Sequence, residues 1–423
     1  MLYRILKFIV AQSLKIHYKN IKSFNVGAIP EKGPLIIAPN HPNSFLDALI
    51  IAVQVNRPLY FLARSDVFNK KWAAFLLKKM QLIPIYRITE GIDKFHKNQE
   101  TFDHCHEILA NDGALLIFPE GLSKQEKRLQ ELKKGLARIA FSFVGSHPQK
   151  RLSIVPVGIN YDKITAFNSH ILVGFGHPFT LDPWMKDYND KPNLAYQAFN
   201  IYLEQALKKH LIEITPEHEE VFHAFSEIDP CFEQNSLDRK HLIAEGILKL
   251  SEKDKKNFNE VESQSHKAEA LLTDYGLSFK HFKHKVNVKA IDLFILIMLL
   301  PFTFTGLVFN WWIYFAGKGI AKLLPKKHEQ FYTSVRFGSA TLLWIIWAIF
   351  LTAVLSPISL WFLLTPIVLF IALKTLLKTK RKLLKIKRLF ALQRLNADVK
   401  KHHELIESIK ELMNYRNKNE LIP

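Results

Sequence analysis

The sequence predicts an α/β domain, with a mainly parallel sheet flanked by helices, followed by a helical linker and C-terminal transmembrane helices. Two observations lead to this prediction. Over residues 34–215, short apolar segments alternate with helix-like segments, a pattern typical of a parallel sheet covered by helices. Beyond residue 290, two apolar runs exceed the roughly twenty residues that a helix needs to cross a bilayer.

The elements of the α/β domain follow from the length of each apolar segment and from the residues that end it. Short apolar segments predict buried strands, and longer segments with a helical period predict the helices between them. Gly113 follows the helix that we expect to end at Ala110, where glycine is a common stop signal. The predicted strands cover 34–38, 59–63, 114–118, 153–158 and 171–175, with a short extended segment at 83–86, and the predicted helices begin at about Pro42 or cover 70–80, 92–110 and 130–144.

The two apolar runs cover residues 291–316 and 337–373. The second run has Pro357 near its middle, and at ~1.5 Å per helical residue it is long enough for two short crossings joined at Ser356–Pro357. Buried helices of a soluble core are the alternative, which the length of the runs disfavours.

Lysine and arginine flank both apolar runs. They cluster at 280–289 before the first run, at 318–336 between the runs and at 374–388 after the second. Basic flanks prefer the cytoplasm, so a single crossing by the first run would place one basic loop outside. We therefore expect the first run to be re-entrant or sharply bent at 301–306, and the second run to form a hairpin. We also expect the basic tail that follows the second run to attract anionic lipid.

The composition indicates what kind of partner and compartment to expect. The formal net charge of +19 indicates an anionic partner, which can be a lipid surface, a nucleic acid or an acidic substrate. The two cysteines, Cys105 and Cys231, cannot form a disulfide framework, which fits a reducing compartment. Lys7 interrupts the first apolar stretch and no small-residue cleavage site follows, so a secretory signal is not expected.

The first residues have the pattern of an amphipathic helix. Apolar residues from Leu2 to Ile16 fall roughly on one helical face, and Arg4, Lys7, Lys15 and Lys19 surround that face with positive charge. This pattern fits a helix that lies in a membrane interface. It fits equally well a surface helix that packs on its own domain, and the segment alone does not separate the two.

The strongest chemical signal is the segment from Asn40 to Asp47, Asn-His-Pro-Asn-Ser-Phe-Leu-Asp. A strand precedes His41 and a helix follows it, and a proline suits the first position of a helix. Sheet folds build their sites at such strand ends. A carboxylate at Asp47 that accepts from one ring nitrogen of His41 would fix the tautomer and raise the basicity of the other nitrogen, which can then take a proton from an alcohol.

Three further segments accompany this pair. The strand 114–118 leads into Phe-Pro-Glu-Gly, with Glu120 and Gly121 in a turn that Ser123 and Lys124 follow, a combination suited to phosphate. Ile-Pro-Ile-Tyr-Arg places Arg87 at a strand end, where its guanidinium can bind phosphate with two hydrogen bonds. The strand Val-Pro-Val-Gly at 155–158 either lines an acyl path or is an ordinary core strand.

In this order, the four segments resemble the phospholipid/glycerol acyltransferase family, which shows a His–Asp block, a strand ending in Arg, a Phe-Pro-Glu-Gly block and a Val-Pro strand. The resemblance covers about half of the chain. It implies a glycerol-3-phosphate acyltransferase-like fold, with His41 as the general base and Asp47 as its orienting partner. It also implies that Arg87, Glu120 and Gly121 bind a glycerol phosphate.

Two departures from the family pattern stand out. Five residues, Pro42 to Leu46, separate His41 from Asp47 where most members have four, and the third block continues Leu-Ser-Lys in place of Thr-Arg-Ser. Both departures resemble a subgroup that contains fungal glycerol-3-phosphate and dihydroxyacetone-phosphate acyltransferases. The resemblance leaves open whether Ser123 and Lys124 take the phosphate role of the missing arginine, and both are candidate substrate-binding residues.

The activity that the resemblance implies is that of a membrane-bound O-acyltransferase of phospholipid (phosphatidic acid) biosynthesis. The fatty acyl group would pass from acyl-coenzyme A or acyl carrier protein, as co-substrate, to glycerol 3-phosphate or dihydroxyacetone phosphate, with no cofactor and no metal. Acylation of 1-acylglycerol 3-phosphate (lysophosphatidate) or another lysolipid is the close alternative, and a catalytically silent membrane scaffold is the remote one.

One cluster outside these blocks has the composition of a metal site. Asp103, His104, Cys105 and His106 are consecutive, but adjacent and i+2 residues face different sides of a helix. The sequence therefore favours a surface helix at this place.

The expected chain has five parts, and we expect an integral membrane protein with its active site on the cytoplasmic face. Its partners would be a lipid membrane, the acceptor and the acyl donor, and not a nucleic acid, because the soluble part shows no aromatic-basic platform. The parts are an amphipathic interfacial helix at 1–26, an acyltransferase domain at 27–215, a helical insert or linker at 216–290, membrane-embedded helices at 291–373 and a basic helical tail at 374–423.

Overall fold

The computed structural model describes residues 2–86, 98–228, 237–279, 290–324 and 331–418. The chain divides into two compact units. The first consists of residues 1–212 and 327–334, and the second of residues 213–326 and 335–423.

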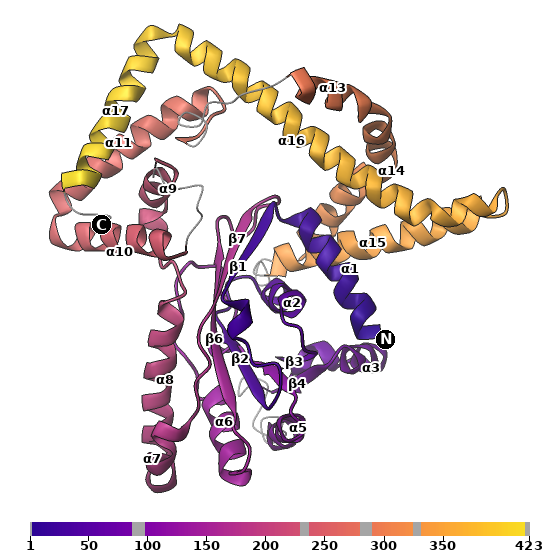
Figure 1. The fold of residues 1–423 in the computed structure, drawn as a ribbon, viewed down its shortest axis with the longest axis vertical. Coiled ribbons are helices and arrows are strands. Elements are labelled where there is room, and N and C mark those ends of the chain that lie inside the picture. Colours follow the sequence, from indigo (N-terminus) through magenta and orange to yellow (C-terminus); the bar gives the residue numbers. More distant parts are fainter. Residues whose placement is uncertain (1, 87–97, 229–236, 280–289, 325–330, 419–423) are drawn as a thin grey trace. The chain divides into compact units, whose positions relative to one another are not determined.

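The first unit is built on a sheet in which seven strands of the described residues have the order β1-β7-β6-β2-β5-β3-β4 (Figure 1). All neighbouring strands pair in parallel except β6 and β7, which are antiparallel. The predicted α/β fold with a mainly parallel sheet is therefore confirmed. The strands are β1 (Asn20–Phe24), β2 (Leu35–Pro39), β3 (Leu59–Arg64), β4 (Leu82–Ile85), β5 (Ala114–Leu116), β6 (Ser153–Tyr161) and β7 (His170–Phe175).

Helices cover both faces of this sheet. In β2, Ile36 and Ala38 join the core cluster formed with α5, α6 and α8, whereas Leu35 and Ile37 are equally buried on the opposite face, because side chains alternate along a strand. Figure 1 shows α8 on one side of the sheet and α1 and α2 on the other. The helices of this unit are α1 (Leu2–His17), α2 (Phe45–Gln54), α3 (Lys71–Lys79), α5 (Asn98–Ala110), α6 (Gly135–Ser146), α7 (Met185–Asp190) and α8 (Pro192–Lys208), with short 3-10 turns at η1 (Val26–Ala28), η2 (Ser65–Phe68) and η4 (Asp182–Trp184).

The N-terminal helix packs on its own domain by one face. Leu14 is buried, and the Lys7 ammonium donates to the carbonyl oxygen of Val55 just after α2, at 2.5 Å. Burial lowers the pKa of Lys7. Ile5 and Phe8 on the outer face are exposed, so a lipid interface remains a prediction for that face only.

Two predictions about elements of this unit were wrong, and one strand was not predicted. The helix after β2 begins at Phe45 and not at Pro42, because Ser44 has a positive φ of 52° that a helix does not allow. The helix expected over 130–144 begins at Gly135. The edge strand β1 was not predicted, because its sequence Asn-Ile-Lys-Ser-Phe is neither a continuous apolar run nor a regular alternation, and its residues are only partly buried.

The second unit is helical. The Asp254 carboxylate caps the N-terminus of α11, and the Tyr275 hydroxyl donates to the Asp398 carboxylate at 2.9 Å, which joins the ends of α11 and α16. Its helices are η5 (Pro216–His218), α9 (Glu219–Ile228), α10 (Leu237–Lys253), α11 (Lys255–Asp274), α13 (Ala290–Met298), α14 (Leu300–Lys322), most of α15 (Tyr332–Leu355), η8 (Leu360–Leu364), α16 (Thr365–Ala397) and α17 (Val399–Lys418).

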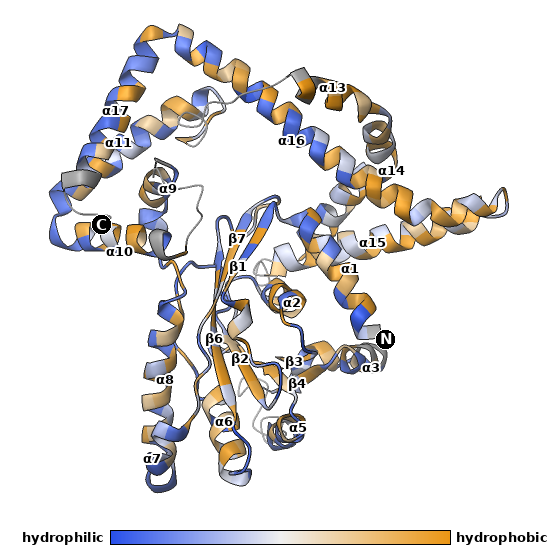
Figure 2. Ribbon diagram, in the orientation of Figure 1, coloured by the Kyte–Doolittle hydropathy of each residue, from blue (hydrophilic) through white to orange (hydrophobic). Residues whose placement is uncertain are grey.

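Two helical stretches of the described residues, Tyr332–Leu355 and Leu360–Ala397, are long and apolar enough to cross a membrane. Only 11% of the most apolar part of each is buried within the protein, whereas the core helix of a soluble protein is mostly buried. Figure 2 shows α14, α15 and the start of α16 as predominantly hydrophobic, and α17 as largely hydrophilic. The second apolar run therefore forms two candidate spans, with the break at 356–359 where the sequence predicted it.

The first apolar run divides into α13 and α14, with the break at Leu299 rather than within 301–306, because α14 continues unbroken through Gly306. α14 packs on α15 and α16, and the α14 residues that face these helices include small and polar ones. A Cβ at Gly306 would meet the Ala372 carbonyl oxygen at 2.4 Å, and the Trp344 indole N–H donates to Asn310 Oδ1 at 3.0 Å. This arrangement suits helices that have lipid as their outer solvent.

Candidate functional site

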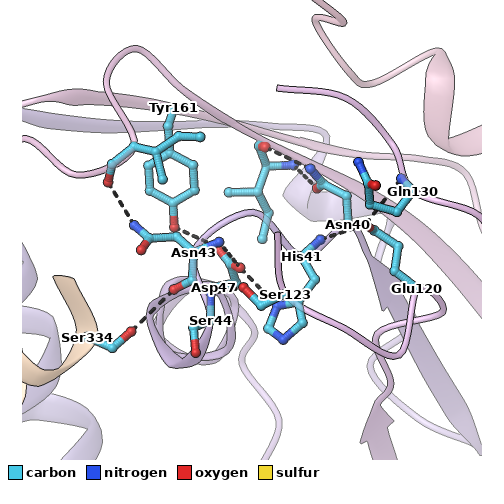
Figure 3. Close-up of polar contacts among 12 residues, drawn as sticks. Asn40, His41, Asn43, Ser44, Asp47, Glu120, Ser123, Gln130, Tyr161 and Ser334 are labelled. Carbon is cyan, nitrogen blue, oxygen red and sulfur yellow. Dashed lines mark hydrogen bonds and ion pairs between the residues drawn. The ribbon is translucent and has the colours of Figure 1, made fainter. Parts of the chain in front are cut away.

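The predicted imidazole and carboxylate meet in the loop between β2 and α2. His41 follows β2, Asp47 lies in the first turn of α2, and Nδ1 of the ring is 3.0 Å from Asp47 Oδ2 (Figure 3). Asp47 is fully buried, whereas 17% of the His41 side chain is exposed. An ionised carboxylate only accepts hydrogen bonds, so this contact places the ring hydrogen on Nδ1 and leaves the Nε2 lone pair available.

Two further donors hold the Asp47 carboxylate. The backbone N–H of Asn43 donates to Oδ2 at 2.7 Å, and the Tyr161 hydroxyl donates to Oδ1 at 2.6 Å. Burial, together with the Asp47 charge, raises the pKa of Tyr161 well above its usual range, so the hydroxyl remains a donor. Three donors therefore compensate a carboxylate that has lost contact with water.

Glu120 fixes the loop that carries His41. It is nearly fully buried, its Oε1 accepts from the backbone N–H of His41 at 2.7 Å, and its Oε2 accepts from the backbone N–H of Gln130 at 3.2 Å. The turn beyond it needs Gly121, whose φ is +68°. The Phe118 ring stacks on the His41 ring with 3.6 Å between centroids and 15° between planes, which restricts the orientation of the imidazole.

The residues after Gly121 contact the same loop. Ser123 Oγ accepts from the backbone N–H of Ser44 at 2.8 Å, and the backbone N–H of Lys124 donates to the His41 carbonyl oxygen at 3.2 Å. The Lys124 ammonium is exposed and pairs with Glu126 at 2.7 Å, where it lowers the pKa of that carboxyl. Among the described residues of the predicted set, Lys124 is the basic one, and its backbone contacts the loop that carries His41.

Six of the seven predicted site residues therefore lie together, and Arg87 lies outside the described residues. The structure also brings in residues that sequence reasoning missed. Tyr161 could have been found, because it ends β6, which is parallel to β2, and parallel strands present their ends at one edge. Arg64 ends β3 at the same edge, where its guanidinium pairs with Asp66 at 2.5 Å.

The second candidate cluster has the contacts of an ordinary helix. The His106 ring contacts Ser142 at 2.9 Å, and His104 lies 3.3 Å from Glu107. Burial raises the pKa of Cys105 to about 12. Among the described residues, no three His, Cys, Asp or Glu side chains are grouped so as to hold a metal ion.

Comparisons with known proteins identify the domain that carries the site. A family model described as Acyltransferase matches residues 20–160. The chain is 32% identical over 108 residues to glycerol-3-phosphate O-acyltransferase 2 of Saccharomyces cerevisiae, a match that covers 25% of this chain and 14% of the yeast protein. It is 28% identical over 142 residues to lyso-ornithine lipid O-acyltransferase of Rhizobium meliloti, covering 33% of this chain and 44% of that protein.

A solved structure is also similar to this chain. The 1-acyl-sn-glycerophosphate acyltransferase of Thermotoga maritima has a TM-score of 0.36 and 15% sequence identity to it, over 48% of this chain and 76% of that one. The curated relatives are thus matched over less than half of their own length.

Proposed function

Residues 20–160 belong to the acyltransferase family, and from this premise we propose that the chain transfers a fatty acyl group to an alcohol with His41 as the general base. The observation that carries the proposal is the 3.0 Å contact between His41 Nδ1 and the buried Asp47 carboxylate, with the opposite ring nitrogen available at the edge of the sheet. A positioned general base of this kind typically contributes 10²–10⁴-fold to the rate.

The reaction follows from these groups without a covalent enzyme intermediate. His41 Nε2 accepts the proton of the acceptor hydroxyl while the hydroxyl oxygen attacks the carbonyl carbon of an acyl thioester. The C–O bond forms, the C–S bond breaks, and the protonated ring returns the proton to the departing thiolate. Asp47 stabilises the ring while it carries two protons, as the carboxylate does in other histidine-dependent acyl transfers.

Glycerol 3-phosphate or dihydroxyacetone phosphate is the acceptor that we propose first. The similarity to the yeast glycerol-3-phosphate O-acyltransferase supports it, and so does the exposed, basic Lys124, whose backbone N–H donates to the His41 carbonyl oxygen. Arg87, Gly121 and Ser123 complete the proposed phosphate set, and acyl-coenzyme A or acyl carrier protein would be the donor.

A lysolipid acceptor is the second candidate, because the match to the lyso-ornithine lipid O-acyltransferase extends over more of that relative's length. Acylation of glycerol 3-phosphate, dihydroxyacetone phosphate or lysophosphatidate would belong to phospholipid metabolism, whereas acylation of a lyso-ornithine lipid would make an amino-acid lipid without phosphate. The two candidate spans support attachment to a membrane, with the site on the cytoplasmic side where the basic flanks prefer to lie.

The experiment offers labelled acyl thioester and the purified full-length protein to glycerol 3-phosphate, dihydroxyacetone phosphate, lysophosphatidate and lyso-ornithine lipid in parallel. We expect product with one phosphate-bearing acceptor and none with the His41→Ala variant. Turnover at the wild-type rate by that variant would refute the mechanism. No product with any acceptor would favour a silent scaffold.

A further inference from the structure

A segment far outside the family match lies on the catalytic loop. Ser334, in the first turn of α15, is only 8% exposed, and its hydroxyl donates to the Asn43 carbonyl oxygen at 3.3 Å (Figure 3). Thr333 beside it is fully buried. These residues belong to the same compact unit as the site, although the family match ends at residue 160.

The same segment reaches the end of a second strand. The Arg64 guanidinium, at the end of β3, lies 5.9 Å from the ring centroid of Phe331. β2 and β3 flank β5, whose end leads to Phe118 and Glu120. Contacts to the loop after β2 and to the end of β3 therefore place residues 331–334 along the sheet edge that carries the site.

Apolar side chains are exposed at this edge as well. Phe45 follows Ser44 and is 43% exposed, and Leu122 precedes Ser123 and is 53% exposed. The residues next to them in sequence, Ser44 and Ser123, are in contact: the backbone N–H of Ser44 donates to Ser123 Oγ at 2.8 Å. Exposed apolar side chains gathered around a polar site indicate contact with lipid or with an acyl chain.

The apolar run of α15 begins at Phe337, three residues after Ser334, which is a rise of about 4.5 Å along the helix. We propose that residues 331–334 are a wall of the acyltransferase site, which fixes the Asn43–Ser44 loop and holds the site at the surface of a lipid bilayer. The inference rests on the proposed function and adds to it the partner that the site faces.

The test of the wall uses the full-length protein in phosphatidylcholine vesicles that contain phosphatidylglycerol. Ser334→Ala removes the hydrogen bond, Ser334→Leu forces the helix away from the loop, and Ser334→Thr retains the hydroxyl. Ser339→Ala is the matched control, because the Ser339 hydroxyl donates to the Val335 carbonyl oxygen of its own helix at 2.6 Å.

We expect kcat to fall roughly three- to tenfold in Ser334→Ala and about a hundredfold in Ser334→Leu, while the KM for the acyl thioester stays unchanged. Ser334→Thr should retain most of the wild-type kcat, and Ser339→Ala all of it. A Ser334→Leu variant with wild-type kcat would overturn the proposal, as would an equal loss in the Ser339→Ala control.

A second measurement does not depend on activity. Leu122→Cys and Leu194→Cys replace leucines of similar exposure, 53% and 55%, in a chain whose Cys105 and Cys231 are replaced by alanine. An environment-sensitive fluorophore at position 122 should be quenched by spin-labelled lipid and protected from iodide, and one at position 194 should respond the opposite way. Equal iodide quenching at both positions would refute the lipid-facing edge even if the enzyme is active. Lipid quenching at position 122 in a protein without activity would refute only the proposed function.

Discussion

The Tyr161 hydroxyl offers the sharpest test of how the buried carboxylate is held. Tyr161→Phe removes the donor that lies 2.6 Å from Asp47 Oδ1, and it keeps the ring that packs 6.1 Å from the Tyr18 ring. The other oxygen keeps its two donors, the Asn43 N–H and the His41 ring. One oxygen of a fully buried anion would then lack the hydroxyl that compensates it.

A hydrogen bond to a charged group contributes about 1.5–3 kcal/mol, and 1.4 kcal/mol corresponds to tenfold in a rate or equilibrium constant. We therefore expect Tyr161→Phe to unfold at lower denaturant concentration by about that free energy and to lose roughly ten- to a hundredfold in kcat. Because burial and the Asp47 charge raise the pKa of Tyr161, the wild-type hydroxyl stays protonated over the range of the assay, and the loss should not depend on pH on the alkaline side.

The assay compares kcat and KM for acyl transfer, with urea unfolding of the same preparations. Tyr202→Phe is the control, because Tyr202 is an exposed tyrosine on α8 far in sequence from the loop. A Tyr161→Phe protein with wild-type kcat and wild-type unfolding free energy would show that Asp47 does not need its third donor. The conclusion that three donors stabilise the buried Asp47 carboxylate would then be wrong.

Four further outcomes follow from the same geometry. His41→Ala should abolish acyl transfer and leave the unfolding transition in place, as measured by circular dichroism, since the ring is partly exposed. Glu120→Gln should lower the unfolding free energy by about 1–3 kcal/mol, because one acceptor becomes a donor that faces a backbone N–H. Gly121→Ala should cost about 1–2 kcal/mol by urea unfolding, because its φ of +68° strains any side chain. Cys105, buried and with a pKa raised to about 12, should resist maleimide at pH 8 in a Cys231→Ser chain until urea unfolds it, since the thiolate is the reactive form.

The buried strands could be predicted because their signal is local. Leu35 to Ala38 and Ile154 to Val157 are continuous apolar runs, and such runs in an α/β chain belong in the centre of a parallel sheet. β1 could not be predicted in this way. Its residues are half exposed, and its pairing partner β7 is about 150 residues further along the chain, so nothing local marks it as a strand.

The chemistry of the site could be predicted from residue types, but its supports could not. His41, Asp47 and Glu120 were identified by the order of their motifs. The contacts that hold them are made by backbone N–H groups, by the Tyr161 hydroxyl and by Ser334, and these come from loops and from a distant helix. Backbone donors carry no sequence signal, and Ser334 lies 291 positions from the carbonyl group that it contacts.

The five-residue spacing between His41 and Asp47 is explained by where the helix begins. On a helix that started at Pro42, Asp47 would lie in the second turn and point away from a histidine at the junction. Ser44 instead takes a φ of 52°, so that α2 begins at Phe45 and Asp47 falls in its first turn. A carboxylate there is stabilised by the helix N-terminus, and it accepts the Asn43 N–H as well as the ring. The additional residue between His41 and Asp47 is therefore accommodated in the loop by the strained backbone of Ser44. Deleting a residue from 42–46 should break the 3.0 Å contact rather than restore a more usual geometry.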